Sequence, residues 1–203
     1  MKKILIIIVL AVIAYFGINY INSTPEQVVI QEVVSESDIE VSEAPEDAFQ
    51  VAEASTLAWV GTKPLGSHDG TVDLESGYLT ADYEGVFIID MTTLYTPDGD
   101  GIGKHLKSKD FFDVEVHPQA FFIVDGYDDN MLSGELTIHG VTQEVEIPAE
   151  VSIIEDTMSI VASYEFDRTD YNITYKSGSV FENLGDALIN DTVSLSIDLI
   201  AQR

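Results

Sequence analysis

The sequence predicts an all-β protein, an eight-stranded antiparallel β-barrel with an elongated apolar cavity. After residue 53, apolar and polar residues alternate with a period of two in eight short runs, as in antiparallel strands with one wet and one dry face. Turn residues separate the runs. A two-sheet sandwich would show the same alternation. The inward positions favour the barrel, because small residues among the large ones leave space for a ligand.

Residues 1–22 are predicted to be a signal anchor or a signal peptide. Met1-Lys2-Lys3 precedes the stretch ILIIIVLAVIAYFGINYI, in which only Asn19 is strongly polar. Its length suffices for a membrane span of about 17 to 25 residues and exceeds the roughly 7 to 15 apolar residues of a secretory signal. We therefore expect residues 4–21 to form a transmembrane helix, with cleavage as the alternative. The rest of the chain is then periplasmic or otherwise extracytoplasmic, tethered to the inner membrane or secreted.

Residues 23–53 are predicted to be an acidic disordered tether. From Asn22 to Glu53 the chain has nine carboxylates, no basic residue and two prolines. Charge repulsion and low aromatic content favour an extended chain over a packed element. We therefore expect the folded domain to span residues 54–203.

The strands of this domain follow from the alternation. The runs are 57–62, 70–79, 83–91, 120–124, 132–139, 145–151, 158–166 and 193–199. A short helix is expected near residues 102–112, and it ends in Phe111 and Phe112. Phe121 and Phe122 follow closely, and four exposed phenylalanines would form an aggregation-prone patch. We therefore expect the barrel to bury them.

The composition excludes several classes of function. The net charge is -27, and from Thr56 onward 27 acidic residues stand against 7 basic ones. Such a surface repels phosphate backbones, so nucleic-acid binding is disfavoured. The chain has no cysteine, which excludes disulfides, thiolate catalysis and thiolate metal sites.

The polar motifs predict no catalytic residues and no metal site. Ser67-His68-Asp69 has the residue types of a hydrolase triad, but neighbours on an extended chain point to opposite sides, so we interpret it as a turn. The four histidines lack the spacing of a chelating pair. The sequence 98–101, DGDG, lacks the remaining ligands of a calcium loop. A headgroup enzyme would need an activated group among His105, Asp110 and Arg168, for which the sequence gives no geometry.

Strand parity and one basic cluster provide candidates for ligand binding. Lys104, Lys107 and Lys109 lie beside Phe111 and Phe112. They can balance nearby carboxylates, or they can form a basic rim that meets an anionic headgroup. The headgroup candidates are Lys104, His105 and Lys107. By parity, the candidates for the cavity wall are Trp59, Phe87, Ile89, Met91, Phe111, Phe112, Phe122, Leu136, Ile138, Ile147, Ile160, Tyr164 and Phe166.

Several stretches, taken in order, resemble the YceI-like family of polyisoprenoid-binding proteins. They are Gly66-Ser67-His68-Asp69-Gly70, Phe87-Ile88-Ile89-Asp90-Met91, His105-Leu106-Lys107-Ser108-Lys109-Asp110-Phe111-Phe112-Asp113-Val114, Pro118, Gly134-Glu135-Leu136-Thr137-Ile138-His139-Gly140-Val141-Thr142, Phe166-Asp167-Arg168-Thr169-Asp170-Tyr171 and Asn190-Asp191-Thr192-Val193. The resemblance implies a lipocalin-like extended barrel whose apolar tunnel takes up a long isoprenoid or related lipid in the bacterial envelope. The long apolar lead and the acidic tether depart from the family's usual cleavable signal.

Two functions stay open at this stage. The first is binding, storage or transport of a long-chain lipid without catalysis. The resemblance then implies no cofactor apart from a bound isoprenoid, quinone or fatty-acyl lipid, and it adds a membrane redox protein as a candidate partner. A homodimer is a further candidate assembly. The second function is an envelope interaction or stress-response protein with a filled barrel and no ligand. A continuous tunnel would contradict the second.

Overall fold

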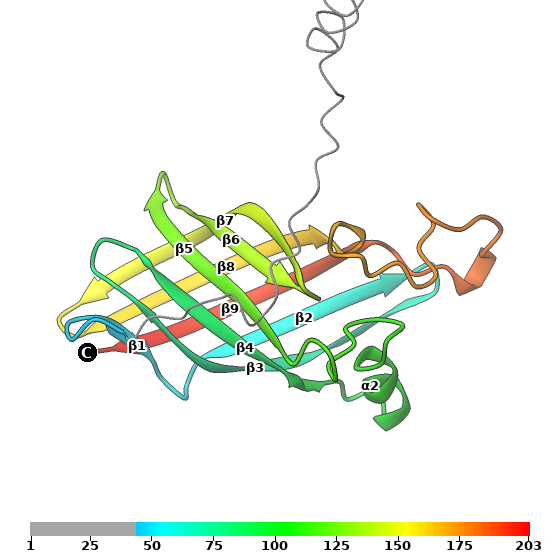
Figure 1. Ribbon diagram of the computed structural model, residues 1–203, viewed down its shortest axis with the longest axis horizontal. Coiled ribbons are helices and arrows are strands. Elements are labelled where there is room, and N and C mark those ends of the chain that lie inside the picture. Colours follow the sequence, from blue (N-terminus) through cyan, green and yellow to red (C-terminus); the bar gives the residue numbers. More distant parts are fainter. Residues whose placement is uncertain (1–43) are drawn as a thin grey trace, which may run out of the picture. The chain divides into compact units, whose positions relative to one another are not determined.

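The computed structural model describes residues 44–203. The predicted anchor, residues 1–22, and residues 23–43 of the predicted tether lie outside the described residues. Within residues 44–203, no helix has both the length and the apolar character that a membrane crossing requires. This part of the chain is a barrel of antiparallel strands with short helices gathered at one end (Figure 1).

Nine strands and three short helices make up the described chain. The strands are β1 (Phe49–Val51), β2 (Thr56–Lys63), β3 (Gly66–Leu79), β4 (Gly85–Tyr95), β5 (Gln119–Asp128), β6 (Met131–Ile138), β7 (Val141–Ile154), β8 (Thr157–Asp167) and β9 (Thr192–Gln202). The helices are α2 (Asp100–Leu106) and two 3-10 turns, η2 (Arg168–Tyr171) and η3 (Gly185–Ala187). The eight predicted runs correspond to β2 through β9.

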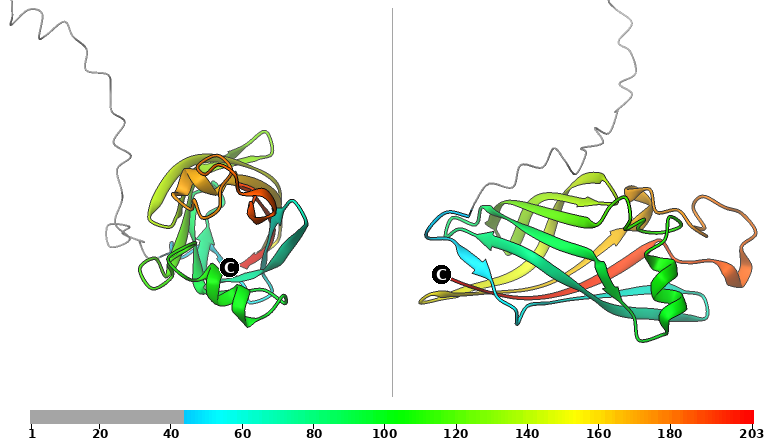
Figure 2. Two further views of the ribbon diagram at one scale, coloured as in Figure 1. Left: turned by 90° about the vertical axis from the view of Figure 1, so that its right-hand side faces the viewer. Right: turned by 60° about the horizontal axis from the view of Figure 1, so that its bottom comes forward.

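Eight of these strands close the sheet on itself. From β2 to β9 each strand pairs antiparallel with the next along the chain, and β9 also pairs with β2, where Leu195 lies opposite Trp59. Viewed from one end, the strands form a ring with α2 at its rim (Figure 2). The barrel is thereby confirmed and the two-sheet sandwich is excluded.

The ninth strand, β1, lies in line with β2 at one end of the barrel. It pairs with β3 and β9, the two strands that flank β2, and places Phe49 opposite Leu79. Between β1 and β2, the Ser55 hydroxyl donates to the carbonyl of Ile200 and accepts from its N–H. A side chain thus satisfies backbone groups that the interrupted strand leaves unpaired.

This strand corrects the predicted domain boundary. It lies within the segment 23–53, which the sequence analysis assigns to a disordered tether, so the folded domain begins before residue 54. Three strand residues in an acidic stretch are too few to show a period of two. Burial of Phe49, which is 0% exposed, makes this short segment part of the core.

The inward and outward faces follow the predicted parity. On β7, Ile147 and Ala149 are buried, whereas Glu144, Glu146 and Glu150 are exposed. Most buried apolar side chains of the strands form one core inside the barrel, whereas Val86 and Phe121 are buried outside this core. Because the carboxylates lie on the outer face, they keep their hydration.

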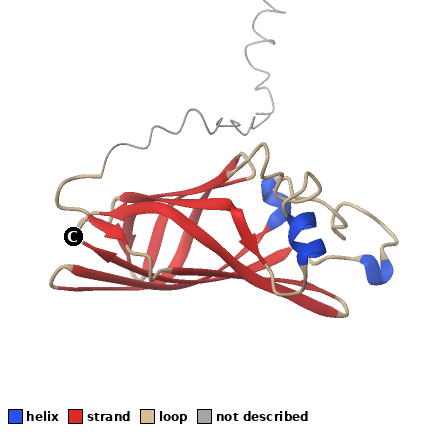
Figure 3. Ribbon diagram, turned by 90° about the horizontal axis from the view of Figure 1, so that it is seen from below, coloured by secondary structure: helices blue, strands red, loops and turns tan. Residues whose placement is uncertain are grey.

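The two ends of the barrel differ. At one end, Phe49, Leu79 and Met158 are fully buried, and the guanidinium of Arg203 lies 4.5 Å from the centroid of the Phe49 ring. We call this the closed end. At the other end lie α2 and the two long connections, residues 96–118 and 168–191 (Figure 3). We call this the open end.

Strands β7 and β8 separate in the half of the barrel nearer the open end. Their ladder ends at the pair Ala149–Ala162, next to Pro148, which has no N–H to donate. Beyond this point η2 lies beside β7, with Tyr171 buried, and Gln143 of β7 donates to a backbone carbonyl of η2 at 3.1 Å. We call this line, along which η2 lies beside β7 and no β7–β8 hydrogen bonds form, the seam.

One local prediction is confirmed only in part and another is wrong. The short helix predicted near residues 102–112 is present, but it spans Asp100–Leu106 and ends early, because the Ser108 hydroxyl bonds the carbonyl of His105 at 2.8 Å and competes with the helical pattern. Residues 107–117 form successive turns instead. The stretch 67–69, predicted to be a turn, lies in β3. The turn between β2 and β3 is at Pro64, whose fixed φ suits a turn.

Candidate functional site

An apolar cavity of about 510 Å³ lies inside the half of the barrel next to the open end. Its wall includes Trp59, Ile138 and Phe166, and it reaches the exposed residues Gly101 and Asp186 of the two long connections. We call it the mouth cavity. Protein cores contain few voids larger than a water molecule, so this half of the barrel is not a filled core.

A second cavity, of about 70 Å³, lies further toward the closed end. We call it the inner cavity. Leu57, Ile89, Leu136 and Leu195 line both cavities. The two spaces therefore follow one another along the interior, separated by apolar side chains that belong to both walls.

The structure brings all the predicted wall residues to these cavities. The mouth cavity is lined by Trp59, Ile89, Met91, Phe111, Phe112, Leu136, Ile138 and Phe166. The inner cavity is lined by Ile89 and Leu136 again, together with Phe87, Phe122, Ile147, Ile160 and Tyr164. Their contact with a lipid stays a prediction.

The small inward residues have two different roles. Ala120 lines the mouth cavity and Ala162 the inner cavity, but Ala149 lines neither. A Cβ on Gly85 or Gly134 would lie 2.1 or 2.0 Å from a carbonyl oxygen of the neighbouring strand. These glycines therefore allow close approach of strands, and only part of the small-residue pattern reflects empty space.

Three aromatic rings join the two connections at the open end. The His105 ring lies 5.1 Å from Phe111 and 4.9 Å from Tyr175, and Phe111 lies 5.2 Å from Tyr175, all between centroids. His105 Nε2 is also 3.1 Å from Asp110 Oδ2. All three rings line the mouth cavity, so α2, the turns that follow it and the 168–191 connection form its rim together.

Only one of the three headgroup candidates lines the cavity. His105 does, whereas Lys104 is exposed and Lys107 donates to the carbonyl of Thr92 at 2.6 Å. The basic residues in the wall are instead Lys63, Arg168 and Lys176. The alternation of inward and outward residues could have identified Lys63, because it occupies the next inward position of β2 after Trp59 and Gly61.

Lys63 belongs to a short chain of polar contacts. Its Nζ lies 3.0 Å from His68 Nε2, and His68 Nδ1 lies 2.6 Å from Asp98 Oδ2. An ammonium group can only donate, so Nε2 accepts from Lys63 and Nδ1–H donates to the carboxylate. The Ser67-His68-Asp69 motif thus contributes a histidine that orients a lysine.

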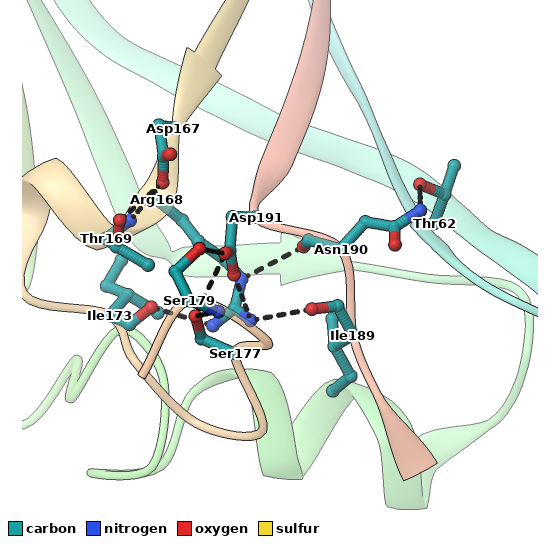
Figure 4. A network of polar contacts seen from close by, with 10 residues as sticks. All are labelled: Thr62, Asp167, Arg168, Thr169, Ile173, Ser177, Ser179, Ile189, Asn190 and Asp191. Carbon is teal, nitrogen blue, oxygen red and sulfur yellow. Dashed lines mark hydrogen bonds and ion pairs between the residues drawn. The ribbon is translucent and has the colours of Figure 1, made fainter. Parts of the chain in front are cut away.

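Arg168 organises the 168–191 connection (Figure 4). Its guanidinium donates to the carbonyls of Ile173, Ile189 and Asn190 at 2.7 to 3.1 Å, and to Asp191 Oδ1 at 3.0 Å. Burial lowers the pKa of Arg168, while Asp191 and Asp167 act in the opposite direction. One buried cation therefore fixes both ends of the connection.

The carboxylate of Asp191 extends this network into the loop. Its Oδ2 accepts from the hydroxyls of Ser177 and Ser179 (Figure 4). Ser177 is 0% exposed. Because a buried charge needs both a partner and hydrogen bonds, the loop conformation and the ion pair stabilise each other.

Two histidines pack against each other at the open end. The rings of His117 and His139 are 4.7 Å apart, and His139 Nδ1 lies 3.1 Å from the carbonyl oxygen of Tyr171. Gly140 follows with a φ of 70°, where a Cβ would lie 2.7 Å from the His117 ring. Burial lowers the pKa of His139 and outweighs the bond to Tyr171, which raises it.

We expect acid to destabilise the fold through His139. Its pKa in the folded chain is below the model-peptide value of 6.5, so the unfolded chain takes up the proton first. The free energy of unfolding therefore falls as the pH drops through about 6.5 and stops falling once folded His139 is protonated too. Urea denaturation between about pH 7.5 and 5 should show a larger loss for the wild type than for His139→Asn.

This comparison isolates the histidine from the other titrating groups. Titrating groups remote from position 139 are the same in both proteins, so their contribution cancels in the difference, and asparagine tolerates the positive φ of 52° at this position. An equal loss of stability in both proteins would show that His139 does not contribute.

A family model for the YceI-like domain matches residues 45–201. Among solved structures, a polyisoprenoid binding domain from Saccharophagus degradans, implicated in plant cell wall breakdown, is similar with a TM-score of 0.63 at 17% identity, over 76% of this chain and 98% of that chain. BcnA from Burkholderia cenocepacia is similar with a TM-score of 0.58 at 19% identity, over 73% of this chain and 96% of that chain. No curated protein sequence matches.

The matched part forms nearly the whole of both solved chains. Those solved chains therefore consist almost entirely of this barrel, and residues 44–203 contain the closed sheet and the core of the present one. The family model covers more than half of the sequence and the folded part almost completely. The chain belongs to the YceI-like family.

Proposed function

We propose that the barrel binds a long-chain isoprenoid or a similar lipid and catalyses no reaction. The observation that carries this proposal is the mouth cavity, an apolar space that the inner cavity continues toward the closed end. Each methylene group moved from water into such a space contributes about 0.8 kcal/mol, so a chain molecule gains affinity with length. The polyisoprenoid-binding domain with a similar fold supports the same class of ligand.

The alternative, a filled barrel that acts only through its surface, is disfavoured by the same space. Phe49, Leu79 and Met158 do fill the closed end. A filled barrel would show such packing throughout, whereas its open half contains about 510 Å³ of space. The packed end instead limits how far a lipid tail can extend.

The location and the partners of the protein are further parts of the proposal. The apolar segment 4–21 and the acidic segment that follows support a domain held outside the cytoplasm at the inner membrane. There it would store or carry the lipid, and a quinone cargo would make a membrane redox protein its partner. A homodimer stays a prediction.

Native mass spectrometry of residues 44–203, purified without detergent from a bacterial host, tests the proposal. We expect an additional mass that organic extraction releases and that identifies the lipid class, because an apolar cavity retains its ligand during purification. A protein that carries no such mass and takes up neither prenyl quinones nor prenyl phosphates would contradict lipid binding.

Filling the cavity should abolish binding without unfolding the barrel. Gly61 lines the mouth cavity, and a Cβ there meets nothing within 4 Å. We expect Gly61→Phe to reduce the bound lipid at least about tenfold, the equivalent of losing two methylene contacts. Val60→Phe is the matched control, because Val60 is 39% exposed on the neighbouring position of the same strand. Equal lipid content in both variants would place the ligand elsewhere.

A further inference from the structure

The charges that line the mouth cavity are opposite in sign to the charge of the chain. From Thr56 onward the sequence has 7 basic residues and 27 acidic ones. Lys63, Arg168 and Lys176 line the cavity, whereas Asp186 is the one acidic residue in its wall. Acidic side chains alone are enough to keep the protein soluble. Solubility therefore does not explain why the wall of the mouth cavity is basic.

Lys63 is positioned for a ligand. His68 accepts one of its N–H groups at 3.0 Å and is itself bonded to Asp98 at 2.6 Å. An ammonium group has three N–H donors, so this contact orients the lysine and leaves further donors for an anion in the cavity.

Lys176 and Arg168 contribute differently. Lys176 lies in the 168–191 connection, and its Nζ is 5.1 Å from the centroid of the Tyr175 ring, which itself lines the cavity. Arg168 already donates to three carbonyls and to Asp191. We therefore assign direct contact to the two lysines, and to Arg168 a positive potential behind them.

We propose that the mouth cavity binds the anionic head of its lipid, a phosphate or a carboxylate, between Lys63 and Lys176. This inference rests on the proposed function, which places the apolar tail in the same cavity. The head would lie at the basic part of the wall and the tail along the apolar part. Lys104 and Lys107 do not line this space, so the site differs from the one predicted from the sequence.

Calorimetric titration of residues 44–203 with three probes tests the inference: a prenyl monophosphate, the prenyl alcohol of the same length, and inorganic phosphate. We expect the prenyl phosphate to bind about tenfold or more tightly than the alcohol, as charge-assisted hydrogen bonds predict. The difference should shrink with added salt. A fatty acid and the matching fatty alcohol form a second pair.

Two double variants with the same change of charge locate the effect. Lys63→Gln with Lys176→Gln should remove the preference for the phosphate by lowering the affinity for the phosphate far more than the affinity for the alcohol. Lys104→Gln with Lys109→Gln alters lysines outside the cavity wall and should keep the preference. If both variants lose the preference for the phosphate, the preference comes from the overall positive charge of the lysines at the open end. That result would overturn the anion site between Lys63 and Lys176.

The other outcomes separate the two proposals. Equal affinity of the wild type for phosphate and alcohol overturns the anionic site and leaves lipid binding intact. Binding of neither prenyl compound nor fatty compound overturns the proposed function, and this inference with it. Inorganic phosphate bound as tightly as the prenyl phosphate would assign the lysines to a free anion and not to a lipid head.

Discussion

Replacing Arg168 with methionine should lower the free energy of unfolding by about 3–5 kcal/mol, because removing one partner of a buried ion pair leaves the other charge uncompensated. The Arg168 side chain is 4% exposed and that of Asp191 14%. The substitution also removes the donors that three carbonyl groups of the connection use. We expect the 168–191 connection to loosen and lipid affinity to fall with stability.

Urea denaturation followed by the fluorescence of Trp59, the single tryptophan, measures this effect. Lys109→Met is the matched control, since it removes one positive charge from an exposed side chain and should change stability by no more than about 0.5 kcal/mol. A loss below about 1 kcal/mol for Arg168→Met would show that the network orders the loop without stabilising the barrel.

Phe49→Ala should be similarly destabilising, by about 3–5 kcal/mol, the usual cost of truncating a fully buried phenylalanine. Phe49 is 0% exposed, packs at the closed end where Leu79 lies opposite, and carries the guanidinium of Arg203 over its ring. Its loss removes the main side chain by which β1 is held in the core. We also expect the closed end to open, so that the variant accepts longer lipid tails.

Gln50→Ala is the control for this prediction, because Gln50 is the exposed neighbour in the same strand. Thermal unfolding of the two variants gives the stability, and titration with prenyl alcohols of increasing length gives the tail limit. If both variants unfold at the same temperature, packing of the Phe49 side chain does not stabilise the barrel, and β1 contributes only through its backbone pairing.

Much of the barrel could be predicted because period-two alternation depends only on local sequence. Ile147 and Glu146 show their opposite faces directly in the order of residues. What failed depends on contacts between distant residues or on single side chains. Phe49 is held in the core because β1 pairs with β3 and β9. The helix α2 ends because of one hydrogen bond from the Ser108 hydroxyl. Neither produces a pattern along the chain.

The candidate site divides in the same way. The apolar wall follows from parity, so residues such as Phe87 and Ile160 could be assigned to the interior. The polar part could not, because it is assembled from separate segments. Lys63 meets His68 across a turn and Lys176 comes from the connection after β8. The lysines that cluster in sequence, Lys104 and Lys107, lie outside the wall.

The seam gives the barrel wall an uneven mechanical strength. Along most of its circumference, parting two strands means breaking a ladder of backbone hydrogen bonds. At the seam it means breaking the bonds of Gln143 in β7 and of His139 in the turn before β7 to two backbone carbonyls of η2, and withdrawing the Tyr171 ring. Local opening takes the path with the fewest buried contacts and hydrogen bonds. We therefore expect the wall to open first along this side, between β7 and η2, before any of the paired strands part.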